Sequence, residues 1–206
     1  MYRDVQVKVL VNQDATRLNI LNELSHLDQM TQDDLALLFI AGHGIKDPKG
    51  NYFFLPHDAN TKQLLGTAVQ WSDLQNQLKG LPGKVLLWAD TCHAAGIAGN
   101  TKLRGNTMDM TQLTREFADA ETGVIVLSSS TGQEGSAEYA GWGHGAFTKA
   151  LLDGMNGEAD FDKDGIIHRS ELEAYVKRRV TKLTKGRQHP IAAGPGIQDF
   201  AIVRVR

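Results

Sequence analysis

The sequence predicts an α/β domain built on a mostly parallel sheet with helices on both faces. Two apolar runs, Leu35–Ile40 and Val85–Trp88, have the length and unbroken hydrophobicity of strands that are buried on both faces. A third run, Val124–Leu127, ends in three serines. Segments with helical periodicity lie between these runs, and this alternation is typical of a parallel sheet covered by helices.

The first half of the chain predicts four further elements. Val5–Val11 alternates partly and is rich in valine, so it is β-like. Ala15–Leu27 follows cap-forming residues and carries leucines at helical spacing, which predicts an amphipathic helix. Tyr52–Leu55 is short and aromatic, as strands are, and Trp71–Leu78 predicts a helix with Ser72 as a candidate cap.

In the second half, Gly96–Met110 is rich in turn formers without a periodic pattern, so it predicts an exposed loop. Thr111–Ala120 has a helical pattern, and Thr131–Gly145 predicts a glycine-rich loop. The remaining elements are two helices and a final strand, over Ala146–Met155, Ser170–Leu183 and Gln198–Val205.

Length and charge exclude several classes of protein. The 206 residues suit one domain with a sizeable core. A net charge of −2 gives no basic field for nucleic acid and no polybasic signal for a membrane surface. No apolar run approaches the roughly 20 residues that span a bilayer, and the first residues do not have the pattern of a signal peptide. The single cysteine excludes an internal disulfide, so we expect a reducing, cytoplasmic setting.

The candidate site lies where the first two buried strands end. Ala41-Gly42-His43-Gly44 follows one strand, and Asp90-Thr91-Cys92-His93 follows the other. Because the carboxyl ends of parallel strands meet at one edge of a sheet, His43 and Cys92 are expected to emerge together. Such a pair can act as nucleophile and base. The alternatives are a buried structural thiol and a structural histidine, and we expect His93 to be structural or pocket-lining.

These two motifs resemble those of caspase-like cysteine peptidases, in particular metacaspases and the bacterial orthocaspases of peptidase family C14. The two residues are about 50 positions apart, as the histidine and cysteine of caspases are. The resemblance extends to YFFLPHDA, GHGAFTKALLDG and GRQHP. It implies a three-layer caspase-like fold over residues 1–206, with a large-subunit-like part at about 1–104 and a small-subunit-like part at about 105–206.

Two departures from the family pattern matter. The glycine after Cys92 comes one position late, at Gly96. The resemblance implies that the family's first strand and first helix would precede Met1, so we expect a preceding segment or another domain of a larger protein to provide them. Without them, an inner edge of the sheet would be unpaired.

The resemblance also implies roles for residues. Cys92 would attack the scissile carbonyl and His43 would act as acid and base, while the backbone N–H groups of Cys92 and Gly44 would hold the oxyanion. Asp90, two residues before the nucleophile, would bind Arg or Lys of a protein or peptide substrate. The alternative is that Asp90 caps backbone N–H groups of the turn.

Other charged residues are weaker candidates. Glu134 and Glu138 could line the same substrate pocket, although solvated loop charges are the commoner explanation. Lys102 and Arg104, in the loop 97–110, would be self-processing sites for an enzyme that cuts after basic residues. The alternative for these two is an exposed loop with ordinary cations.

Asp160–Glu171 fits the twelve-residue EF-hand pattern at each key position. In this pattern the Ca²⁺ ligands are three aspartates, a backbone carbonyl and a bidentate glutamate, here Asp160, Asp162, Asp164, Ile166 and Glu171. Gly165 stands at the turn position. The alternative is an acidic turn that caps the helix beginning near Ser170, since no second EF-hand loop is present to pair with this one.

Three functions therefore stay open. The first is a cysteine endopeptidase that cleaves after Arg or Lys. The second is a catalytically weak or inactive caspase-like interaction module. The third is a Ca²⁺-binding regulatory domain.

Overall fold

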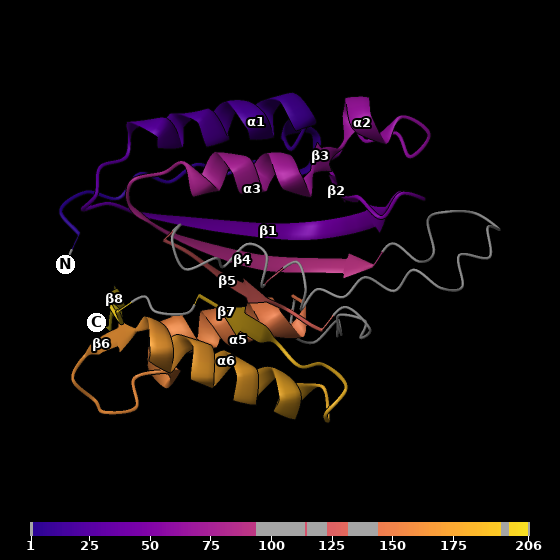
Figure 1. Cartoon of the computed structure of the whole chain (residues 1–206). Helices are drawn as coiled ribbons and strands as arrows, with labels where there is room; N and C mark the ends of the chain where they lie inside the picture. Colours follow the sequence, from indigo (N-terminus) through magenta and orange to yellow (C-terminus); the bar gives the residue numbers. More distant parts are fainter. Residues whose placement is uncertain (1, 94–113, 115–122, 132–143, 195–197, 206) are drawn as a thin grey trace.

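The computed structural model describes residues 2–93, 114, 123–131, 144–194 and 198–205 (Figure 1). Its centre is a six-stranded sheet. Side by side, the strands are β3 (Val69–Gln70), β2 (Tyr52–Leu55), β1 (Leu35–Lys46), β4 (Lys84–His93), β5 (Val124–Ser128) and β7 (Ile191–Ala193). A second, two-stranded sheet joins β6 (Ile166–His168) to β8 (Ala201–Arg204).

Helices cover both faces of the main sheet, which confirms the predicted three-layer α/β fold (Figure 1). One layer contains α1 (Arg17–Ser25) and α3 (Trp71–Lys79), and the other contains α5 (Ala146–Asp153) and α6 (Arg169–Leu183). The shorter elements are η1 (Asn12–Asp14), η2 (His26–Gln29), α2 (Leu64–Thr67) and the π-helical turn η4 (Gly154–Glu158). Among the described residues no helix has both the length and the apolarity needed to cross a bilayer.

The three central strands are parallel and the outer ones are antiparallel. β1 pairs with β4 over ten positions, and β4 pairs with β5 over five. The β5 strand is buried throughout, and β4 is buried from Val85 to Thr91. This burial is what an unbroken apolar run predicts for a strand with helices on both sides.

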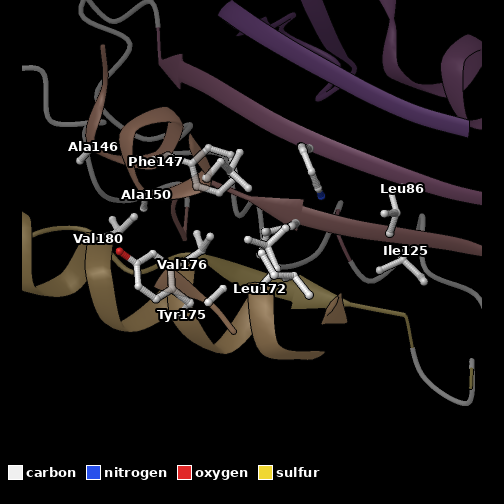
Figure 2. Packing of buried hydrophobic residues seen from close by; sticks show 14 residues of the cluster. Leu86, Ile125, Ala146, Phe147, Ala150, Leu172, Tyr175, Val176 and Val180 are labelled. Atoms are coloured by element: carbon white, nitrogen blue, oxygen red, sulfur yellow. The ribbon is translucent and has the colours of Figure 1, made fainter. Parts of the chain in front are cut away.

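The two faces of the sheet form separate cores. On one face, Leu74 and Leu78 of α3 pack with Val85 and Leu87 of β4. On the other, α5 and α6 pack against the sheet, and Figure 2 shows Phe147, Leu172 and Val176 in this layer. Alternate residues of β4 therefore belong to different cores, because successive side chains of a strand point to opposite faces.

The β1 strand departs from its predicted burial on both faces. It pairs with β2 only from His43 to Lys46, so the edge from Leu35 to Gly42 pairs with no strand of the described part. Leu37 and Phe39 are each 44% exposed, on the face that α5 and α6 cover elsewhere. The apolar run is a strand as predicted, but one of its faces and one of its edges are open.

Some local predictions were wrong. Val5–Val11 forms no strand, and its four valines are 53–76% exposed. Ser72 does not cap α3, because the helix begins at Trp71 after Gln70. Three strands, β3, β6 and β7, were not predicted from the sequence. The predicted final strand is shorter, as β8, and it pairs with β6 rather than with the main sheet. The predicted loop 96–110 and most of the helix 111–120 lie outside the described residues.

Candidate active site

The backbone places His43 and Cys92 side by side at the carboxyl end of the central strands. They are Cα partners in the parallel pairing of β1 with β4, and the next pair is Gly44 with His93. Neighbouring strands lie about 4.8 Å apart. Both residues lie inside their strands, since β1 continues to Lys46 and β4 to His93. His43 is exposed to solvent.

The glycines around His43 make room for aromatic rings of β2. A Cβ atom on Gly44 would lie 1.6 Å from Tyr52 Oη, and one on Gly42 would lie 2.9 Å from Phe54 Cε2. Tyr52 is itself buried and stacks edge-on against Trp71, with 5.7 Å between ring centroids. The glycines therefore allow β2 to pack closely on the strand that carries His43, rather than ending that strand in a sharp turn.

Asp90 is a buried carboxylate on the neighbouring strand. It is 8% exposed, and its Oδ2 accepts a hydrogen bond of 2.8 Å from Thr148 Oγ1, on α5. In the pairing of β1 with β4, Asp90 is the partner of Ala41, two residues before the His43–Cys92 pair on each strand. A buried charge is retained only where polar groups meet it, so Thr148 is part of the environment that keeps this carboxylate in place.

Thr148 was not predicted as part of the site. Its contact with Asp90 joins residues 58 positions apart, and nothing in the local pattern of α5 distinguishes this threonine.

Buried polar groups also line the end of β5. Ser128, Ser129 and Ser130 are at most 3% exposed, and Ser129 N donates to Ala89 O at 2.9 Å. Gln188 is fully buried, and its Nε2 donates to Ser129 O at 2.8 Å. This hydrogen bond joins the segment after α6 to the carboxyl end of the central strands, where the two candidate catalytic residues also lie.

Several predicted site residues lie outside the described residues. These are the two pocket candidates and the two processing candidates, Glu134, Glu138, Lys102 and Arg104.

The structure brings together part of the predicted Ca²⁺ ligand set. Oxygens of Asp160, Asp162 and Asp164 lie within 4.8 Å of one another. Glu171 is not in this group, and both of its oxygens accept backbone hydrogen bonds, from Phe161 N and His168 N. The backbone N–H of Ile166 donates to Asp164 Oδ1 at 2.7 Å.

Comparison with known proteins places this geometry in context. A family model described as the caspase domain matches residues 2–198. Among solved structures, the chain is similar to the crystal structure of protein GSU0716 from Geobacter sulfurreducens, with a TM-score of 0.60 and 20% sequence identity. That alignment covers 91% of this chain and 77% of the other, and at this identity it shows a shared fold only. No curated protein matches the sequence.

Proposed function

Because the chain belongs to the caspase-domain family of peptidases, C14, we propose that it is a cysteine endopeptidase in which Cys92 is the nucleophile and His43 the acid–base. The observation that carries this proposal is the register that makes the two residues direct neighbours on β1 and β4. A nucleophile and its base must come within hydrogen-bond reach of each other and of one peptide bond. The pairing of His43 with Cys92 on adjacent strands supports this, because it brings their backbones side by side.

The proposed reaction follows from the chemistry of a thiol beside an imidazole. His43 takes the proton of Cys92, and the thiolate attacks the scissile carbonyl carbon. The C–N bond breaks as His43 returns the proton to the leaving amine. Water then hydrolyses the thioester, with His43 accepting its proton and the thiol leaving. Backbone N–H groups of Cys92 and Gly44 are the proposed oxyanion donors, and loss of one such donor typically lowers the rate about 10²–10³-fold.

We further propose that Asp90 confers a preference for Arg or Lys before the cleaved bond. A carboxylate that is largely removed from water attracts a guanidinium or ammonium group more strongly than an exposed one does. The burial of Asp90 and its hydrogen bond from Thr148 support this role. Such a specificity would also make Lys102 and Arg104 candidate self-processing sites. A reducing compartment such as the cytoplasm would keep the Cys92 thiol available.

A catalytically weak interaction module is the second candidate, and a specific observation favours it. Within the described part of the chain, the strand that carries His43 has an edge without a partner strand from Leu35 to Gly42, and an exposed apolar face at Leu37 and Phe39. If this strand is not held firmly, the imidazole will not be held firmly either, and catalysis falls steeply with small displacements.

A peptide assay distinguishes these candidates. Fluorogenic peptides ending in Arg, Lys or Asp are incubated with the wild-type chain, with and without Ca²⁺. We expect turnover of the Arg and Lys peptides and none of the Asp peptide. Cys92→Ala and His43→Ala should each lower turnover at least about 10³-fold. The control is His57→Ala, which changes an exposed histidine outside the site and should leave turnover unchanged.

Two results would decide against the endopeptidase. Absence of turnover for all peptides, in a wild-type chain that unfolds cooperatively, would favour the interaction module. Turnover that survives Cys92→Ala would assign the activity to another group or to a contaminant. For self-processing, the wild type should yield a pair of fragments divided near Arg104, and Cys92→Ala should not.

A further inference from the structure

We propose that residues 160–171 bind one Ca²⁺ ion, and that the C-terminal strand β8 takes the place of the second loop with which EF-hands commonly pair. This inference does not depend on the peptidase activity. It rests on the chemistry of the donors, on one buried oxygen that has no partner among the described residues, and on the pairing of β6 with β8.

The donor set is the one that Ca²⁺ prefers. Three carboxylates converge so that an oxygen of each lies within 4.8 Å of the others, and Ca²⁺ takes six to eight oxygen ligands. Gly165, at the sixth position of the loop, has a φ of +81°, which the turn requires and which residues with a side chain rarely adopt. Arg169, the first residue of α6, forms ion pairs with Glu173 and Asp199.

The carboxylates are oriented by the loop itself. Asp160 Oδ2 accepts from Gly165 N at 3.1 Å, Asp162 Oδ1 accepts from Asp164 N at 3.2 Å, and Asp164 Oδ1 accepts from Ile166 N. One oxygen of each aspartate is therefore held by the backbone. The cluster is arranged before any ion arrives, which lowers the entropy lost on binding.

One oxygen of this cluster points independently to a cation. Asp160 Oδ1 is buried and accepts no hydrogen bond from the described residues. Leaving a buried carboxylate oxygen without a partner costs free energy, so buried polar atoms in proteins are almost always satisfied. A Ca²⁺ ion among the three carboxylates would satisfy it.

Glu171 stands at the twelfth position of the loop, and its carboxylate already accepts two backbone hydrogen bonds. Its carboxylate caps α6 by accepting from His168 N at 2.9 Å, and it also accepts from Phe161 N at 3.0 Å. Each carboxylate oxygen has a second lone pair, so these hydrogen bonds do not exclude a bond to a metal. We infer that Glu171 completes the site, and this is tested separately below.

The second half of the loop is held by the C-terminal strand. β6 pairs antiparallel with β8, Ile167 with Val203, and Val205 N donates to Gly165 O at 2.9 Å. Ile167 is fully buried. Tyr2 Oη in turn donates to Ala201 O at 2.9 Å, so β8 also contacts the first residues of the chain. An ion in the loop should therefore stabilise β6, β8 and their contacts together.

The test is a calcium titration of the full 206-residue chain carrying Cys92→Ala, after treatment with chelator, so that proteolysis cannot interfere. Calorimetry should detect one Ca²⁺ per chain. At a Ca²⁺ concentration about 100-fold above the Kd, the melting temperature should rise by about 5–10 °C. Mg²⁺ at the same concentration should raise it less, because Mg²⁺ loses its waters reluctantly. Amide exchange of β6 and β8 should slow at least tenfold.

Variants identify the ligands. Asp160→Asn and Asp162→Asn keep an oxygen that accepts the backbone hydrogen bond, whereas Glu171→Gln keeps one of its two accepting oxygens, so its fold is checked by thermal unfolding. Each variant should weaken Ca²⁺ binding at least tenfold. The matched control is Asp47→Asn, since Asp47 also accepts backbone hydrogen bonds in a turn, from Lys49 N and Asn51 N. It should change the Kd by less than twofold.

Four outcomes would overturn the proposal or one part of it. No heat and no change in melting temperature at about 5 mM Ca²⁺ would exclude even a weak site. If Asp162→Asn and Asp47→Asn lowered the Ca²⁺ affinity equally, the ion would be attracted by the negative charge of the protein in general and not bound by this loop. Binding without slower exchange in β8 would refute the pairing role of that strand, and unchanged binding by Glu171→Gln would remove Glu171 from the ligand set.

Discussion

Thr148 Oγ1, in the first turn of α5, donates a 2.8 Å hydrogen bond to the carboxylate of Asp90, two residues before Cys92 on β4. A helix from the second half of the chain thus orients an acid on a strand from the first half. The arrangement makes Thr148 a positioning residue for the proposed substrate pocket.

We therefore expect Thr148→Val to raise the KM for Arg and Lys peptides several-fold while kcat changes little. The hydroxyl that fixes Asp90 is lost, but the groups proposed to break the bond are untouched. Thr148→Ser should restore the KM, because it keeps the donor. An equal fall in kcat for every peptide, or no rescue by serine, would indicate a merely structural role.

A second prediction concerns the packing of Gly44 under Tyr52. Gly44→Ala should lower the free energy of unfolding by about 1–3 kcal/mol, because its Cβ would lie 1.6 Å from Tyr52 Oη in a buried contact. Denaturant titration measures the change. Gly66→Ala is the control, since a Cβ there meets nothing within 4 Å, and it should stay within about 1 kcal/mol of the wild type. Equal stability of the two variants would contradict the proposed contact.

A third prediction follows from the ion pairs that join α5 to α6. Asp153 contacts Lys149 on its own helix and Arg179 Nη2, 3.0 Å away, on the other. Burial disfavours its charged form, but hydrogen bonds from Lys149 and Arg179 outweigh burial and hold the pKa of Asp153 below its ordinary value. A depressed carboxylate pKa stabilises the fold above the unfolded-state pKa and ceases to do so as the pH falls through the folded-state pKa.

Asp153→Asn should accordingly cost about 1–3 kcal/mol near pH 7, and the difference from wild type should shrink below about pH 4. Thermal or denaturant unfolding at several pH values measures this dependence. Asp33→Asn, at an exposed carboxylate, is the control and should cost less than about 0.5 kcal/mol near pH 7. A cost of Asp153→Asn that does not depend on pH would mean that packing, not charge, is responsible.

A fourth prediction concerns the edge and the face of β1 that no described element covers. An unpaired edge beside exposed apolar side chains tends to associate. We expect the apparent mass of the 206-residue chain to rise with concentration in light scattering. Phe39→Lys should shift this rise to at least about fivefold higher concentration, because charge opposes edge pairing. Leu65→Lys changes an equally apolar but more exposed residue on α2 and should have little effect. If both variants behave alike, the association lies elsewhere.

Sequence patterns predicted the elements whose structure depends on local signals. The strand Val85–Trp88 and the helix Trp71–Leu78 appear as β4 and α3 because an unbroken apolar run and a helical period each specify one outcome. Val5–Val11 has an equally good local pattern but forms no strand, because a strand also needs a partner. The exposed face of β1 could not be predicted, since hydrophobicity does not reveal what covers a residue.

Some residues of the candidate site could likewise be predicted from the sequence, and others could not. Two motifs place His43 and Cys92 near the carboxyl ends of two strands, and the pairing of those strands brings the two residues together. Thr148 and Gln188 could not be identified, because their roles depend on contacts across more than fifty residues. The packing of Gly44 against Tyr52 could not be predicted either, since it depends on the register of β1 with β2.

The parallel pairing of β4 with β5 has a consequence for any cleavage between them. Val85–Ala89 lies in register with Val124–Ser128 at the centre of the sheet, and both strands belong to the same two cores. A nick at Lys102 or Arg104 would therefore not release two pieces, but would convert the chain into a non-covalent heterodimer. Such a heterodimer would come apart only on denaturation, and its reassociation would become second order in concentration.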